Sequence, residues 1–219
     1  MHDCSRHKSR FNRREFIKVT AGAGATLILP SCVSDFSSDN GMTAATAILR
    51  ADYDNNLVNV IQAGFELVPP PDVAGKSVLL KPNLVDLPRD GKPIVTNPAV
   101  VIAVAEAFRR RGAAEVIVGD GPGLQRDAWQ IVDAIGLTPL LAENALDFVD
   151  LNMSEIHPQS NTGGLNGLDP LYFSRTVFEA DVMVSLPKMK THHWAGATLS
   201  MKNLFGTSSG LVYGCPRNQ

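Results

Sequence analysis

The chain has 219 residues and a mass of 23.5 kDa, which is enough for one domain of ordinary size with or without a tail. Hydrophobic residues make up 44% and charged residues 19%, a globular composition that argues against a largely disordered chain. The formal net charge is −2, which gives no general case for nucleic-acid binding. No repeat of about 20–50 residues is visible, so the sequence does not predict a solenoid or a propeller.

The charge is unevenly distributed along the chain. Residues 1–34 contain six Lys or Arg and two Asp or Glu, for a net charge of +4. Residues 35–219 contain fourteen and twenty, for a net charge of −6. A basic head on an acidic body is typical of a targeting segment.

The basic head has the order of an export signal. Arg13 and Arg14 are followed by Glu-Phe-Ile-Lys and then by the uncharged run 19–32, which has 14 residues. That run is shorter than the roughly 20 residues that a membrane-spanning helix needs. The arrangement resembles a twin-arginine signal, which implies the Tat export machinery as a partner and a periplasmic or cell-surface location. The alternative is a basic N-terminus that happens to precede a core helix.

The signal ends with Leu-Pro-Ser-Cys at residues 29–32, which resembles a bacterial lipobox. The resemblance implies lipidation of Cys32 and attachment of the mature protein to a membrane surface. Ordinary cleavage nearby, with Cys32 incidental, is the alternative. We therefore expect a signal peptide over residues 1–32, a tether over 33–42 and one domain over 43–219.

The cysteines agree with export without a disulfide scaffold. Cys4 lies in the head, Cys32 would be acylated, and Cys215 is the third cysteine. The mature chain would then have no intramolecular disulfide. The sequence has no Cys-x-x-Cys pair, so it predicts neither an iron–sulfur cluster nor a structural zinc.

Short apolar runs alternate with helical patterns along the body of the chain. Asn97 and Pro98 predict the clearest helix start, as N-cap and first helical residue, and Gly112 ends that helix. The pattern predicts strands at 43–50, 77–80, 115–118, 148–151, 171–174 and 181–186, and helices at 57–67, 97–111, 127–135 and 175–180. Residues 152–170 are polar and predict a Gly-rich loop or a surface hairpin. The alternation indicates an α/β fold with a mostly parallel sheet and flanking helices.

Unusual residues follow three of the predicted strands. Strand 77–80 is followed by Lys-Pro-Asn, strand 115–118 by Gly-Asp-Gly-Pro-Gly, and strand 181–186 by Pro-Lys-Met-Lys-Thr-His-His. Ligands of parallel α/β sheets bind at the carboxyl ends of the strands, so these loops should open on one edge. No Asp or Glu follows Asp181, whereas three lysines and Arg217 do. A cationic edge on an acidic body predicts a site for an anionic group.

We therefore expect a cleft in which four lysines converge, with Asp120 and His192 at its rim. The candidate catalytic residues are Asp120, Lys188 and His192. The candidate ligand-binding residues are Lys81, Asn83, Gly121, Lys190, Thr191, Thr198, Lys202 and Asn203. If these segments do not converge, they would instead stabilise the fold.

Simpler interpretations stand beside these assignments. Lys81 could be an ordinary solvated lysine, and Asp120 between glycines could only form a turn. His192 and His193 point to opposite sides if they lie on a strand, which disfavours a metal pair, and we assign no metal ligands. The helical spacing of Leu199, Met201 and Leu204 predicts core positions, with Lys202 and Asn203 facing elsewhere.

Four strings of this sequence together resemble the DUF362 family, a domain of unknown function. They are VLLKPNLV, TNPAVV, GAAEVIVGDGPG and DVMVSLPKMKTHHWAGATLSMKNLFG, in the family's order from about Val60 onward. The resemblance implies an α/β domain whose motif residues line one site. It also implies that the family domain continues past the string YGCPRNQ, so the sheet would be incomplete at its C-terminal end. Some relatives carry ferredoxin-like modules, which suggests redox connections for the family.

Three functions remain open from the sequence. The first is an exported enzyme that acts on an anionic small molecule, with lysines neutralising charge and Asp120 or His192 moving protons. The second is a lipoprotein that binds such a molecule without chemistry. The third is an accessory protein that handles a metal or redox cofactor, whose identity is unknown.

Overall fold

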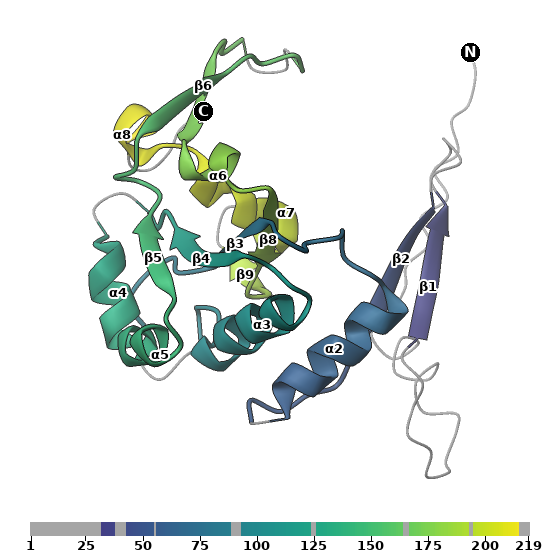
Figure 1. Cartoon of the computed structure of the whole chain (residues 1–219). Helices are drawn as coiled ribbons and strands as arrows, with labels where there is room; N and C mark the ends of the chain where they lie inside the picture. Colours follow the sequence, from purple (N-terminus) through teal and green to yellow (C-terminus); the bar gives the residue numbers. More distant parts are fainter. Residues whose placement is uncertain are drawn as a thin grey trace, which may run out of the picture. The chain divides into compact units, whose positions relative to one another are not determined.

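The computed structural model describes residues 32–37, 43–54, 56–88, 93–123, 126–163, 167–192 and 195–214 (Figure 1). The predicted twin-arginine segment, the side chain of Cys32, and the residues His193 and Cys215 lie outside these described parts. Residues 32–37, at the predicted junction of signal and tether, form β1 (Cys32–Ser37), which pairs with β2 (Thr43–Ile48) in a two-stranded sheet.

The centre of the domain is a parallel four-stranded sheet with the order β5-β4-β3-β8. The strands are β3 (Ser77–Pro82), β4 (Glu115–Asp120), β5 (Asp147–Asp150) and β8 (Val182–Leu186). The α/β prediction with a mostly parallel sheet is therefore confirmed. Both central strands run two residues further than predicted, because Lys81 still pairs with Ser185 and Asp120 with Asp150. Lys81 and Asp120 thus belong to the strands and not to the loops that follow.

The helices start where local capping predicts. In α3 (Pro98–Arg110), the Asn97 side chain accepts a hydrogen bond from the Ala99 backbone N–H at 2.8 Å. In α4 (Ala128–Ala134), the Asp127 carboxylate caps two backbone N–H groups. α2 (Leu57–Leu67) packs on α3 through the rings of Phe65 and Phe108, whose centroids are 5.0 Å apart. Figure 1 shows α3, α4 and α5 along one side of the sheet.

The longest helix that was not predicted follows α4. α5 (Leu137–Glu143) begins directly after Gly136, which the sequence pattern treats as a helix end. Gly136 has a φ of +71°, a left-handed conformation that glycine adopts without a Cβ clash. The chain turns there and starts a second helix, which buries Leu137 and Leu141.

The polar stretch 152–170 contains the first strand of a β-hairpin, and the second strand follows it. β6 (Ile156–Gln159) pairs antiparallel with β7 (Leu171–Ser174), so the surface-hairpin alternative is confirmed in part. The remaining elements are short. They are α6 (Thr176–Glu179), β9 (Lys190–His192), β10 (Gly196–Thr198), α7 (Ser200–Asn203), the 3-10 helix η1 (Leu204–Thr207) and α8 (Gly210–Tyr213).

The core lies between the sheet and the helices, and nearly every residue of β3 and β4 is buried, as expected for parallel strands covered on both faces. The predicted core positions near the C-terminal end are wrong. Leu199 and Leu204 are exposed, and 86% of Met201 is accessible to solvent, whereas Asn203 is 2% exposed. α7 is a single turn, and its buried side meets the polar ends of β3 and β8, so an asparagine fits there and a methionine does not. In the described part of the chain, no helix has the length and apolar character needed to cross a membrane.

Candidate functional site

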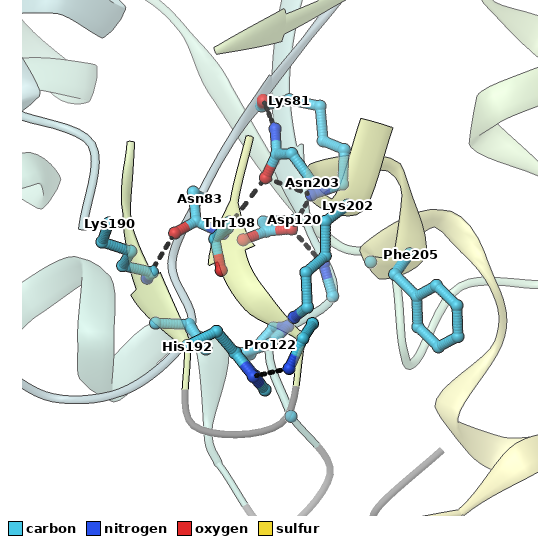
Figure 2. Close-up of a pocket in the computed structure, with 15 residues that line it drawn as sticks. Lys81, Asn83, Asp120, Pro122, Lys190, His192, Thr198, Lys202, Asn203 and Phe205 are labelled. Atoms are coloured by element: carbon cyan, nitrogen blue, oxygen red, sulfur yellow. Dashed lines mark hydrogen bonds and ion pairs between the residues drawn. The ribbon is translucent and has the colours of Figure 1, made fainter. Parts of the chain in front are cut away.

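A cleft of about 510 Å³ opens at the carboxyl edge of the parallel sheet (Figure 2). Its walls come from the ends of β3 and β4, from the β9–β10 hairpin and from α7 and η1. The residues that line it are Lys81, Asn83, Val85, Asp120, Gly121, Pro122, Gly123, Lys190, His192, Ala195, Thr198, Lys202, Asn203, Phe205 and Gly206. Segments more than a hundred residues apart in sequence therefore meet at one edge, where strand-end reasoning predicts a ligand site.

The floor of the cleft is a buried ion pair between Lys81 and Asp120. Their exposed fractions are 1% and 2%, and the Lys81 Nζ contacts the Asp120 Oδ1. Asp120 also accepts hydrogen bonds from the backbone N–H of Gly121 at 2.9 Å and of Leu84 at 2.6 Å. The expectation that Asp120 lies at the rim is therefore wrong. Since Asp120 already neutralises Lys81, that lysine is not the cation that faces a ligand.

Two asparagines extend the floor. Asn203 accepts hydrogen bonds from the Lys81 Nζ at 3.3 Å and from the Asn83 Nδ2 at 3.2 Å. Its own Nδ2 donates to the Lys81 carbonyl at 3.0 Å and to the Ser185 hydroxyl at 2.9 Å. These bonds tie α7 to β3 and β8 and fix the side-chain oxygen of Asn83 away from Asn203. Buried polar groups that are paired in this way give a rigid floor.

Gly206 covers the ion pair. A Cβ at this position would lie 2.7 Å from both the Asp120 Oδ1 and the Lys81 Nζ. Only a glycine allows η1 to approach the pair this closely. The sequence gives no separate signal for this role, because the contact comes from a residue about ninety positions away from Asp120.

The β9–β10 hairpin supplies the opposite wall. Lys190 and His192 are two residues apart on β9, so both project from the same face, and both line the cleft. Thr191 projects the other way and is exposed, which is why it does not line the cleft. The register pairs Lys190 directly with Thr198 of β10. Thr198 is 3% exposed, and its hydroxyl has no hydrogen-bond partner among the residues that the structure describes.

Among the described residues, the partners of the Lys190 amine are uncharged. It donates to the Asn83 Oδ1 at 2.7 Å and to the backbone carbonyl of Ile94. Burial and the neighbouring Lys202 lower the pKa of Lys190 to about 8, with a smaller opposing effect from Asp120. The Lys190 side chain is thus a partly desolvated amine beside a second cation.

The remaining polar groups of this wall are His192 and Lys202. The Nδ1 of His192 accepts the backbone N–H of Ala195 at 3.1 Å, so in the neutral ring the proton is on Nε2. Lys202, on α7, lines the cleft and belongs to none of the ion pairs found among the described residues.

The glycine-rich loop after β4 is held in place from β5. The Asn152 Nδ2, next to the end of β5, donates to the Pro122 carbonyl at 2.8 Å. Gly121, Pro122 and Gly123 line the cleft as a result. In the parts of the chain that the structure describes, no three His, Cys, Asp or Glu side chains are grouped so that they could hold a metal ion.

The structure brings together all but two of the residues singled out from the sequence. Lys188 and Thr191 do not line the cleft, although Lys188 lies near enough to lower the pKa of Lys190 slightly. Pro122 and Gly123 lie in the glycine-rich loop that was expected at this edge, whereas sequence reasoning missed Val85, Ala195, Phe205 and Gly206. Some of these lie within the motif strings, but their residue types alone indicate packing.

Comparison with known proteins gives a family and no known activity. Thylakoid-associated protein sll1697 of Synechocystis sp. is 33% identical over 138 residues. That match covers 63% of this chain and 41% of the relative, so the chain spans less than half of that protein's length. No solved structure shows significant similarity to the chain. Residues 78–214, which include the whole cleft, match the family described as "Domain of unknown function (DUF362)", and the chain belongs to this family.

Proposed function

We propose that the cleft binds a small anionic molecule between Lys190 and Lys202. The observation that carries this proposal is the charge balance of the lining. It contains three lysines and one carboxylate, and that carboxylate is already paired with Lys81. Lys190 and Lys202 therefore have no carboxylate partner in the lining of this partly buried cleft, and an anion would offset their mutual repulsion.

The other lining residues narrow the kind of anion. Val85, Pro122 and Phe205 give the cleft an apolar part, and half of Phe205 is exposed. A volume of about 510 Å³ lies within the usual range for small-molecule sites. The cleft suits a molecule with one anionic group and an apolar body, in preference to a bare inorganic ion.

Calorimetric titration with phenyllactate tests this proposal, because that probe has a carboxylate and an aromatic ring. We expect saturable binding by the wild-type protein and at least about tenfold weaker binding by Lys202→Met, equivalent to ~1.4 kcal/mol. Lys188→Met is the matched control, because it removes a nearby lysine that does not line the cleft. Inorganic phosphate should bind more weakly than phenyllactate. Equal binding of phenyllactate by the wild type and Lys202→Met would refute the anion site.

We also propose that the chain is exported by the twin-arginine route and anchored through a lipidated Cys32. The support is the order of the basic pair, the uncharged run and Cys32 in the sequence. The cyanobacterial relative is described as thylakoid-associated, and membrane attachment would be the corresponding property here. Replacing Arg13 and Arg14 by lysine should leave precursor in the cytoplasm, and Cys32→Ala should abolish fatty-acid labelling. Normal export of the first variant or unchanged labelling of the second would contradict the respective proposal.

A further inference from the structure

The surroundings of the Lys190 amine differ from those of a lysine that only binds charge. Its two acceptors, the Asn83 Oδ1 and the Ile94 carbonyl, are both neutral oxygens. A tetrahedral nitrogen bonded to Cε and donating to these two atoms has one position left. In a neutral amine, two N–H bonds satisfy both acceptors and the lone pair occupies that remaining position. The protein therefore provides hydrogen-bond partners for the neutral form of Lys190.

The residue opposite Lys190 has an unused polar group. Thr198 pairs with Lys190 in the hairpin register, and residues paired in this way have Cβ atoms about 4.5–5.5 Å apart on the same face. The Thr198 hydroxyl is buried, lines the cleft, and has no partner in the described part of the chain. Leaving a buried hydroxyl unpaired is unfavourable, so this group is placed to bond with a ligand atom next to Lys190.

The third observation is a cation that can hold the ligand while Lys190 is neutral. Lys202 lines the same cleft from α7, and its charge also disfavours protonation of Lys190. A desolvated amine next to a second cation is the arrangement that activates lysine as a nucleophile. Lys202 and Lys190 thus have separate tasks, one for the anionic group and one for an electrophilic carbon.

We propose that Lys190 forms an imine with the carbonyl carbon of an anionic ligand, which places a 2-oxo acid among the substrates of this cleft. The proposal rests on the proposed anion site. Lys202 would hold the carboxylate, Lys190 would attack the adjacent carbonyl carbon, and Thr198 would hydrogen-bond the carbonyl oxygen.

The step balances without any oxidant or reductant. The Nζ lone pair forms a bond to the carbonyl carbon, the carbon–oxygen π electrons move to oxygen, and a proton passes from nitrogen to oxygen to give a carbinolamine. A second proton then reaches the hydroxyl, the carbon–oxygen bond breaks, and water leaves as the nitrogen lone pair forms the protonated imine. His192, on the same face of β9 as Lys190, is the nearest titratable group along the strand and the candidate donor of that second proton.

Reductive trapping tests the proposal on the intact chain. The protein is incubated with phenylpyruvate and cyanoborohydride, and the adduct is located by intact mass and peptide mapping. We expect one adduct, on Lys190, and protection from it by phenyllactate, which has the same carboxylate and ring but no carbonyl. Lys190→Met should lose the adduct, and Lys202→Met should form it at least about tenfold more slowly. Lys76→Met, which removes a partly exposed lysine that does not line the cleft, should match the wild type. The protection experiment needs only wild-type protein, so it decides the matter even if Lys190→Met does not fold.

The outcomes separate this proposal from the anion site. Saturable phenyllactate binding without an adduct on Lys190 overturns the imine while the anion site stands. Adducts spread over lysines outside the cleft, such as Lys188, and unaffected by phenyllactate also overturn it. If phenyllactate does not bind to the wild-type protein, both proposals fail together.

Discussion

The two sides of the cleft use similar side chains under opposite conditions. On the floor, Lys81 is fully buried, paired with Asp120 and hydrogen-bonded to Asn203. On the hairpin side, Lys190 is half-buried and has neutral acceptors, and Thr198 has a buried hydroxyl with no partner. The polar groups of the floor are paired with one another inside the protein. Those of the hairpin side are available to a ligand.

This difference indicates which polar groups maintain the fold and which bind a ligand. Removing one partner from a compensated buried pair leaves an isolated charge, which is costly. Removing an uncompensated group relieves a cost that the folded protein carries without ligand. The following predictions test this division, from the largest expected effect to the smallest.

The largest effect should come from Lys81→Met, because it leaves the Asp120 carboxylate buried without its cation. We expect the free energy of unfolding to fall by about 3–5 kcal/mol in urea denaturation at neutral pH. Lys76→Met is the control, because Lys76 is partly exposed and donates only to the Asp72 carbonyl. A loss below about 1 kcal/mol would show that the ion pair of Lys81 does not maintain the fold, and Lys81 would then be available to bind a ligand.

The second prediction concerns the close approach of η1 to the ion pair. Gly206→Ala should destabilise the protein by about 1–3 kcal/mol, since the added Cβ would lie 2.7 Å from both charged atoms. Gly123→Ala is matched to it, because that glycine lines the same cleft and a Cβ there meets no atom within 4 Å. Equal unfolding midpoints for the two variants would show that η1 does not lie as close to the Lys81–Asp120 ion pair as the structure indicates.

Thr198→Val should have the opposite sign. It replaces an unpaired buried hydroxyl by a methyl group of similar size, so we expect the unliganded protein to gain about 1 kcal/mol in unfolding free energy. Thermal or urea denaturation measures this gain, and Thr96→Val provides the contrast. The Thr96 hydroxyl donates to the Leu186 carbonyl at 2.6 Å, so its removal should destabilise. Loss of stability in both variants would mean that the Thr198 hydroxyl is paired in the protein.

The smallest effect is a pH dependence of stability. Burial and Lys202 lower the pKa of Lys190 from 10.5 to about 8 in the folded protein, so the unfolded chain binds that proton more tightly. The cost of charging Lys190 is present in full below pH 8 and disappears as the pH rises toward 10.5. The stability of the wild type relative to Lys190→Met should therefore rise across this window, in urea melts at several pH values. Lys202, Asp120 and Lys188 act on the charge of Lys190, and His192 lines the same cleft. These four groups are common to both proteins. A constant difference would show that Lys190 has an ordinary pKa.

Sequence patterns within a few residues predicted most of the helices and strands of the central domain. The Asn97–Pro98 helix start and the apolar strands are patterns within a few residues, and the strand-end rule brought Lys81, Asp120 and Lys190 to one edge. The same rule does not say how deep each residue lies, so the burial of Lys81 and Asp120 could not be predicted from it.

The remaining features depend on contacts between distant segments. α7 is a single turn, so its helical spacing carried no information about which side is buried. Met201 was assigned to the core and is exposed, whereas Asn203, which was expected in the site, is the buried residue. The role of Gly206 depends on its distance to charged atoms on other strands. Thr191 lies outside the cleft and Thr198 lines it, and this difference depends on the pairing register of β9 with β10.

A crystal structure of the protein with phenyllactate tests most directly whether the hairpin side of the cleft is a ligand site. The account predicts the carboxylate within hydrogen-bond distance of the Lys202 Nζ, the C2 hydroxyl near Lys190 and Thr198, and an unchanged Lys81–Asp120 pair beneath them. Phenyllactate bound elsewhere, or a carboxylate that displaces Asp120 from Lys81, would contradict it.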